Sequence, residues 1–371
     1  MADATKIEWT DATWNPITGC SVVSPGCTNC YAMKLAGTRL AHHPSRAGLT
    51  RDTKAGPVWN GTLRFNEEWL TQPLHWKRPR MVFVCAHGDL FHEDVPDEWI
   101  DMIFVVMALS PQHTFQVLTK RAKRMRAYFE GLDRDECDDK GPRLTAAVNA
   151  VMRIGHTDWG ICGSTGTHIT TRLSRSGAME AQMLRSTPDG GIERLVTWTA
   201  TEERWRRCGQ PFADRIHAAW GNLPYPRDFG WGLKQWPLPN VWLGVSAEDQ
   251  TRWDERLDDL RETPAAVRFV SAEPLLGPVQ DDMHGLDWII VGGENGPRPM
   301  QAEWARQIRD ACAAAGTAFF FKQWGNHIPA GQTMANGKIW APGCSTPLRA
   351  TKGITGRLLD GVEHNAMPRV A

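Results

Sequence analysis

The sequence predicts an α/β protein built as a TIM-like parallel β/α barrel, full or partial, with an inserted subdomain. Three observations predict it. Short apolar runs end abruptly in polar loops and are followed by helical stretches. The runs are continuously apolar, which is typical of parallel strands that are buried on both faces. A middle segment rich in Gly, Arg, Ser and Thr interrupts this rhythm.

Short apolar runs mark the predicted strands. Six apolar runs are clear, at 81–84, 115–118, 241–245, 267–270, 288–291 and 318–321. Two weaker candidates lie at 12–17 and 63–65. The total of six to eight strands fits a complete or partial barrel.

Three stretches between these runs predict helices. The stretch 96–109 begins with Pro and two acidic residues, which favour a helix N-terminus, and is strongly apolar afterwards. The stretches 249–262 and 302–315 are amphipathic.

Changes in composition divide the chain into four parts. We expect residues 1–130 to form the N-terminal part of the barrel and 237–328 its C-terminal part. Between them, 131–236 reads as an inserted subdomain or lid. Residues 329–371, rich in Gly and Pro, read as a peripheral tail.

Composition limits the class of protein. The 371 residues carry 42 Lys and Arg against 42 Asp and Glu, so no global basic field points to nucleic acid. The N-terminus lacks the pattern of a secretion signal, and no apolar run approaches the ~18 residues of a spanning helix. We therefore expect a cytoplasmic protein without a membrane partner; the oligomeric state is left open.

Three of the nine cysteines are clustered, as Cys20, Cys27 and Cys30 in a loop containing Gly and Pro. Soft thiolates are the preferred ligands of iron–sulfur clusters and of zinc. Three cysteines on a [4Fe–4S] cluster leave one iron open for another ligand. The alternative is a structural zinc site completed by His42, His43 or a distant cysteine.

The motif resembles the signature of a family of phage and bacterial three-Cys-motif proteins that is grouped with radical S-adenosylmethionine (SAM) enzymes. The resemblance covers about residues 5–130 and 238–326. Its matching segments are WNPITGC, SPGCTNCYA, DLFHEDVP, VLTKRAKRM, NVWLGVSAEDQ, RFVSAEPLLGP, IIVGGENGPRPM and FFFKQWG.

The resemblance implies a [4Fe–4S] cluster on Cys20, Cys27 and Cys30 that cleaves SAM reductively, with a flavodoxin- or ferredoxin-like electron donor. It implies that Tyr31 lies near the SAM adenine. A glycine-glycine-glutamate element would contact the methionine amino group, and a cation would balance the methionine carboxylate. The residues implied for these two roles are Gly292, Gly293 and Glu294, and Arg298 or Lys322.

Polar residues follow all six predicted strands. Because barrel active sites are built from the C-terminal strand ends, we expect these residues to converge on the cysteine loop. The candidate catalytic residues are Asp89, Glu273 and Lys322. The other members of the set are His92, Glu93, Lys120, Arg121, Ser246, Glu248, Ser271, Asn295 and Gln323.

The substrate is the least determined part of the prediction. A phage setting favours modification or repair of a nucleobase or nucleic acid, and arginines lie near tryptophans in the insertion, a combination that suits backbones and bases. These residues are Arg172, Arg175, Arg185, Arg204, Arg206 and Arg207, with Trp198 and Trp205. The main alternative is a nucleic-acid-associated binding or regulatory protein with a structural metal site.

Overall fold

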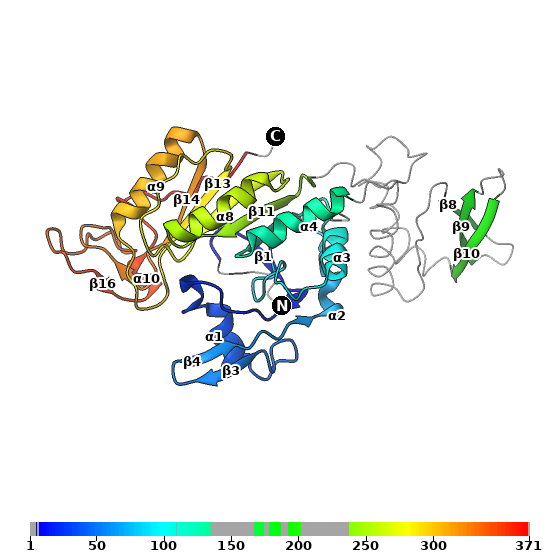
Figure 1. Cartoon of the computed structure of the whole chain (residues 1–371), viewed down its shortest axis with the longest axis horizontal. Helices are drawn as coiled ribbons and strands as arrows, with labels where there is room; N and C mark the ends of the chain where they lie inside the picture. The colour runs from blue at the N-terminus through cyan, green and yellow to red at the C-terminus, as the bar shows by residue number, and fades with distance from the viewer. Residues whose placement is uncertain are drawn as a thin grey trace.

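The computed structural model describes residues 5, 7–108, 110–134, 167–173, 178–186, 192–201 and 237–369, giving the backbone alone for 131–134 and for the three segments between 167 and 201. Seven parallel strands form its central sheet (Figure 1). In spatial order they are β1 (Ala12–Trp14), β6 (Met81–Val84), β7 (Thr114–Thr119), β11 (Val241–Ser246), β12 (Val267–Ala272), β13 (Trp288–Gly292) and β14 (Ala318–Gln323).

Every neighbouring pair in this sheet is parallel, and the spatial order follows the chain order. The α/β class is therefore confirmed. The sheet curls into a half-barrel whose two edges are β1 and β14.

All six clear strand predictions are confirmed, and 12–17 supplies β1. The segment 63–65 differs: β5 (Arg64–Phe65) pairs antiparallel with β2 (Ile17–Thr18), outside the central sheet. The chain leaves the central sheet at Pro16, which has no N–H to offer a ladder, so the next residues pair elsewhere.

The three predicted helices are confirmed as α3 (Asp97–Ala108), α8 (Gln250–Glu262) and α9 (Ala302–Ala315). A further helix, α4 (Ala122–Arg134), follows β7 and contacts α8. The Asp249 carboxylate caps α8 by accepting a hydrogen bond from the Arg252 amide at 3.0 Å. Within the described ranges, no helix is both long and apolar enough to cross a membrane.

The two faces of the sheet carry different side chains. Alternate residues such as Val82, Leu243 and Val291 join the large core that includes the helices. The opposite face carries an aromatic cluster that Trp9 joins from the N-terminal segment. The Trp288 ring contacts Trp242 at 5.9 Å between centroids. This packing fills the half-barrel below its strand ends.

Small elements surround the cysteine loop, which we define as residues 15–30. Helix α1 (Tyr31–Gly37) begins directly after this loop and packs on the hairpin of β3 (Thr50–Thr53) and β4 (Gly56–Trp59). The loop itself contains the short 3-10 helix Pro25–Cys27. Further on, α2 (Glu67–Leu70) and the 3-10 helix Gln72–His75 lead to β6.

Within the predicted insertion, β8 (Thr167–Leu173), β9 (Ala178–Ser186) and β10 (Ile192–Thr201) form an antiparallel sheet with the order β10-β9-β8.

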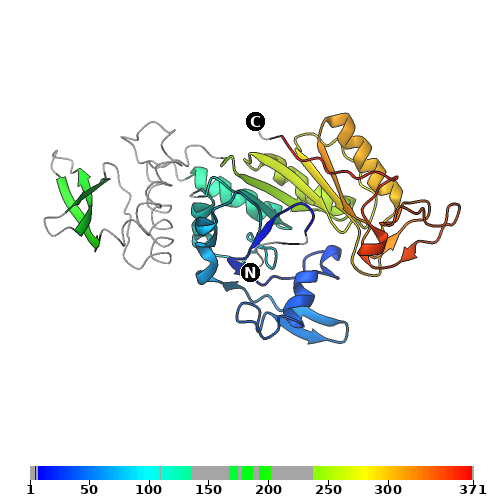
Figure 2. The same cartoon turned by 180° about the vertical axis from the view of Figure 1, so that it is seen from behind.

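The segment expected as a peripheral tail contains β16 (Leu348–Arg349), which pairs with β15 (His327–Ile328) just before the tail, and α10 (Lys352–Thr355). Its last residues run along the edge strand β14, where the Phe321 amide donates to the His364 carbonyl at 2.9 Å. The Trp288 indole donates to the Ala366 carbonyl at 2.9 Å. Figure 2 shows this part of the chain, in red, beside the yellow and orange strands.

Candidate functional site

The loops that follow the strands meet at one edge of the sheet, because all seven strands run in the same direction. The cysteine loop follows β1 and crosses this edge. Its contacts with the other strand-end loops determine what kind of site the edge can form.

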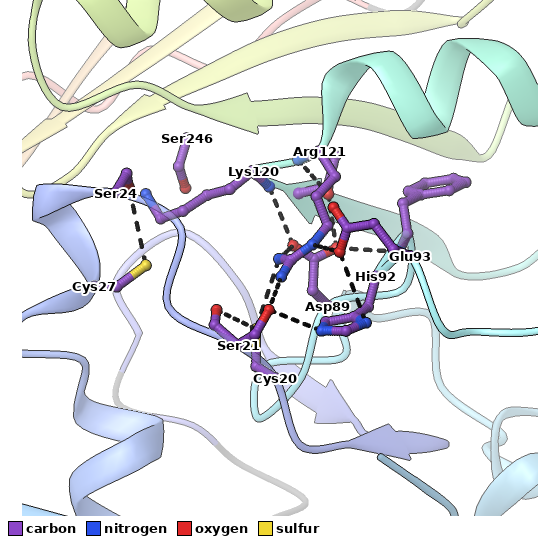
Figure 3. A network of polar contacts seen from close by, with 12 residues as sticks. Cys20, Ser21, Ser24, Cys27, Asp89, His92, Glu93, Lys120, Arg121 and Ser246 are labelled. Carbon is purple, nitrogen blue, oxygen red and sulfur yellow. Dashed lines mark hydrogen bonds and ion pairs between the residues drawn. The ribbon is translucent and has the colours of Figure 1, made fainter. Parts of the chain in front are cut away.

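The first contact joins the cysteine loop to the loops after β6 and β7 (Figure 3). Arg121 donates to the Asp89 carboxylate at 2.8 Å and to the Ser21 hydroxyl at 2.7 Å. The same guanidinium lies 3.7 Å from the Cys20 sulfur and donates to Glu93 at 2.8 Å. The His92 Nε2 lies 2.9 Å from the Ser21 oxygen. A buried ion pair thus fixes the first part of the cysteine loop.

Asp89 is itself held by its neighbours. One carboxylate oxygen accepts from the Thr119 hydroxyl at 2.6 Å, and the other accepts from the Lys120 amide at 3.1 Å. Asp89 therefore orients Arg121, and it has no open position toward a ligand in this arrangement.

The second contact is made by Glu248, which follows β11 and has a fully buried side chain. It accepts from the Gly26 amide at 2.8 Å and pairs with Lys120 at 3.2 Å and with Arg256 at 3.1 Å. Burial alone raises the pKa of Glu248, but Lys120, Ser24, Gly26 and Arg256 outweigh burial and lower it to about 2. Glu248 is therefore ionised at neutral pH and fixes the middle of the cysteine loop.

The third contact comes from the loop after β13. Glu294 is buried and pairs with Arg298, which donates from Nε at 3.0 Å and from its backbone amide at 3.1 Å. Arg298 also donates to the Pro25 carbonyl at 3.0 Å. Burial tends to raise the pKa of Glu294, while hydrogen bonds from Arg298 and Asn29 lower it. This pair therefore contacts the cysteine loop at Pro25, beside Gly26, and at Asn29.

The fourth pair, Glu273 and Lys322, lies on the inner side of the sheet. The Lys322 Nζ is 3.0 Å from a Glu273 oxygen, and the Ser271 hydroxyl donates to the other oxygen at 3.0 Å. The Glu273 charge acts on the Tyr31 hydroxyl, whose pKa is raised by burial, by Cys30 and by Glu273. Tyr31 donates to the Ala86 carbonyl at 2.7 Å.

The glycines of the predicted cofactor element serve internal packing in the structure. A methyl group on Gly292 would lie 2.5 Å from the Glu273 carboxylate, and one on Gly293 would overlap the Trp324 carbonyl. Gly293 therefore requires glycine for contacts within the chain, whereas a side chain at Gly292 would require the Glu273 carboxylate to move.

The three clustered cysteines have free thiols that lie close enough to influence one another. Burial, Asp89 and the other two thiols raise the pKa of Cys20 to about 12, although Arg121 opposes this. Burial and Cys27 raise the pKa of Cys30. The Cys20 and Cys30 thiols are therefore protonated at neutral pH, and a metal that binds them must displace their protons.

A single metal ion requires compact ligands. Sulfurs about 2.3 Å from one zinc ion lie within about 4 Å of one another. Among the described residues, no group of three or more His, Cys, Asp or Glu side chains is arranged to hold one ion. By their donor chemistry, thiolates are ligands both of zinc and of the irons of an iron–sulfur cluster.

The other described cysteines stand apart from this group. Cys312 is buried in α9, Cys344 is exposed, and Cys85 is buried directly after β6 with a positive φ of 55°. The arginines and tryptophans predicted to bind nucleic acid lie outside the residues whose side chains the structure describes.

The sequence predicted that Asp89, Glu248, Glu273, Glu294 and Lys322 would lie around the cysteine loop. Glu248 contacts this loop directly, and Asp89 and Glu294 reach it through Arg121 and Arg298. Glu273 and Lys322 pair with each other, and their place at the loop stays a prediction. Sequence reasoning missed Arg256, Ser21 and Gly26. Arg256 is buried on α8 and pairs there with Glu248, which lies in the strand-end loop before this helix. Its position eight residues after Glu248, on the buried side of an amphipathic helix, is the signal that could have identified it.

Comparison with known proteins gives a single result. No curated protein and no solved structure matches the chain. One family matches residues 4–368, which include the insertion and most of the tail that the sequence resemblance had left unmatched. The chain therefore belongs to the family described as "Protein of unknown function (DUF5131)".

Proposed function

We propose that this chain is a radical SAM-like iron–sulfur enzyme, with Cys20, Cys27 and Cys30 holding a [4Fe–4S] cluster. One observation carries the proposal. Three separate strand-end loops reach the cysteine loop through ion-paired side chains, at Ser21 and at the neighbouring residues Pro25 and Gly26. A loop held at both ends of the spacing between Cys20 and Cys27 is suited to presenting its thiolates to one centre.

When bound, the cluster would supply an electron to SAM, and the protein's own groups prepare its surroundings. Arg121, 3.7 Å from the Cys20 sulfur, would stabilise the thiolate that metal binding requires. Lys120 acts in the same direction on Cys30. Asp89 positions Arg121, which is the role we propose for it in place of direct proton transfer.

Glu273 and Lys322 are the proposed proton-handling pair. They are 3.0 Å apart on the inner side of the sheet, within the electrostatic reach of Tyr31. A carboxylate and an ammonium at this separation can exchange a proton when substrate changes their surroundings.

Glu294, Arg298, Gly292, Gly293 and Tyr31 remain the proposed SAM contacts. Because Glu294 and Arg298 pair with each other, the SAM ammonium and carboxylate must compete with that pair or separate it. The flavodoxin- or ferredoxin-like electron donor and a nucleobase or nucleic-acid substrate belong to the same proposal.

Anaerobic incubation of the purified protein with dithionite and SAM tests the function. We expect 5′-deoxyadenosine as a product, its loss in Cys27→Ala, and its retention in Cys312→Ala, which changes a cysteine buried in α9. Formation of S-adenosylhomocysteine or methylthioadenosine instead would indicate non-radical SAM chemistry. The absence of any SAM product from a fully iron-loaded protein would contradict the proposal.

A further inference from the structure

Arg46 is a buried cation whose partners are all neutral. It is 5% exposed. The other buried arginines, Arg121 and Arg256, each pair with a buried carboxylate. Arg46 instead donates to the Ser45 hydroxyl at 2.6 Å and to His87 Nδ1 at 3.4 Å. Among the described residues, no carboxylate lies within ion-pair distance of it.

A second cation lies near Arg46. Arg64 lies nearby and also has only backbone carbonyl partners, those of Pro44 and Ala47, in the described part of the chain. Burial and the Arg64 charge lower the pKa of Arg46 to about 10, so Arg46 remains charged at neutral pH. A buried charge without an opposite charge destabilises the fold, and a bound anion would remove this cost.

His87 is the second neutral partner of Arg46. Because a guanidinium N–H can only donate, Nδ1 of His87 is the acceptor, and the neutral ring carries its proton on Nε2. Burial and Arg46 lower the pKa of His87 to about 4, which keeps this ring neutral at pH 7. The neutral ring accepts from Arg46 and has one N–H left to donate.

These residues adjoin the cysteine loop. The Gly19 amide donates to the His87 carbonyl at 3.1 Å. The His87 ring meets the Tyr31 ring edge-on, with 5.8 Å between centroids, and Tyr31 directly follows Cys30. A ligand group at Arg46 would therefore belong to a molecule that reaches the strand-end site.

We propose that Arg46 anchors a binding site for an oxyanion, the carboxylate or phosphate group of a small molecule that occupies the strand-end site. The planar guanidinium matches both groups through paired hydrogen bonds, which a lysine cannot reproduce. The site requires no iron, so the binding test does not depend on whether the proposed cluster is present.

Thermal unfolding and calorimetric titration of the full chain at pH 7 and low salt test the site. The probes are inorganic phosphate, adenosine monophosphate and methionine. We expect at least one of them to bind saturably to the wild-type protein, and Arg46→Gln to weaken that binding by about ten- to a hundred-fold. Binding of the two phosphate probes alone identifies a phosphate group, and binding of methionine alone identifies a carboxylate.

The control is Arg306→Gln, which removes the same charge from the distant helix α9 and should leave the affinity unchanged. Without ligand, Arg46→Gln should unfold at the wild-type temperature or above it, because an unpaired buried charge is lost. If Arg46→Gln does not fold, Arg46→Lys must still weaken binding several-fold, because lysine keeps the charge but cannot form the paired hydrogen bonds of the guanidinium. Failure of all three probes to bind the wild-type protein, or equal affinity in the Arg46 variant, would overturn the proposal.

Discussion

Replacing Glu248 with Gln tests whether buried charge fixes the cysteine loop. The substitution keeps the size of the side chain and an acceptor for the Gly26 amide, but it leaves Lys120 and Arg256 without their shared counter-charge. The pKa of Glu248 is lowered from 4.5 to about 2. Since a tenfold change in an acid constant is worth about 1.4 kcal/mol, the charge contributes about 3 kcal/mol to the free energy of unfolding.

The sign of the pH dependence follows from the lowered pKa. The folded state favours the ionised carboxylate, so its contribution is complete above pH 4.5 and is lost as the pH falls toward 2. At pH 7, a loss of about 3 kcal/mol in a chain of this size lowers the unfolding temperature by about 4 °C, given about 2.1 cal/mol/K of unfolding entropy per residue.

The assay is thermal unfolding at several pH values between 3 and 7, with Glu255→Gln as the control. Glu255 lies on α8, the helix that follows Glu248, is 55% exposed and has its partner Arg252 at 3.6 Å, so its loss should cost less than about 0.5 kcal/mol. If Glu248→Gln unfolds at the same temperature as this control at pH 7, the buried ion network does not stabilise the site and the reasoning is wrong.

Three further changes follow from the contacts. Arg121→Gln leaves the buried carboxylate of Asp89 unpaired and should reduce the free energy of unfolding by about 3 kcal/mol in urea titrations; an unchanged midpoint would refute this. Gly293→Ala should destabilise the protein by about 1–3 kcal/mol through a clash with a backbone carbonyl, while Gly277→Ala, with its nearest neighbour at 3.7 Å, should have little effect; equal costs at both positions would contradict the packing argument. Asp360→Asn removes a carboxylate that two arginines of α9 bind, so limited proteolysis should cut the last residues of the tail faster; unchanged cleavage rates would show that this contact does not hold the tail.

The strands and the main helices could be predicted because their signals are local. A strand such as β13 is apolar at every position, since both of its faces are covered, and α9 ends where Gly316 adopts a left-handed φ of 74°. The segment 63–65 shows the limit of this reasoning. A short apolar run does not specify its partner, and this run pairs with Ile17–Thr18 outside the central sheet.

The convergence of polar strand ends could also be predicted, because parallel strands place their C-terminal ends at one edge. The partners within the site could not. Glu248 binds the Gly26 amide across 222 positions of sequence, and Arg298 reaches the Pro25 carbonyl across 273. Such contacts depend on how the loops approach one another in three dimensions. The same holds for Arg46, whose lack of a carboxylate partner is visible only when its neighbours are known.

The metal content of anaerobically purified protein tests the central claim most directly. The account predicts iron and sulfide in the proportions of one [4Fe–4S] cluster per chain, with both lost together in Cys20→Ala, Cys27→Ala or Cys30→Ala and both retained in Cys312→Ala. A colourless protein that carries zinc, or a cluster that survives replacement of these cysteines, would contradict it.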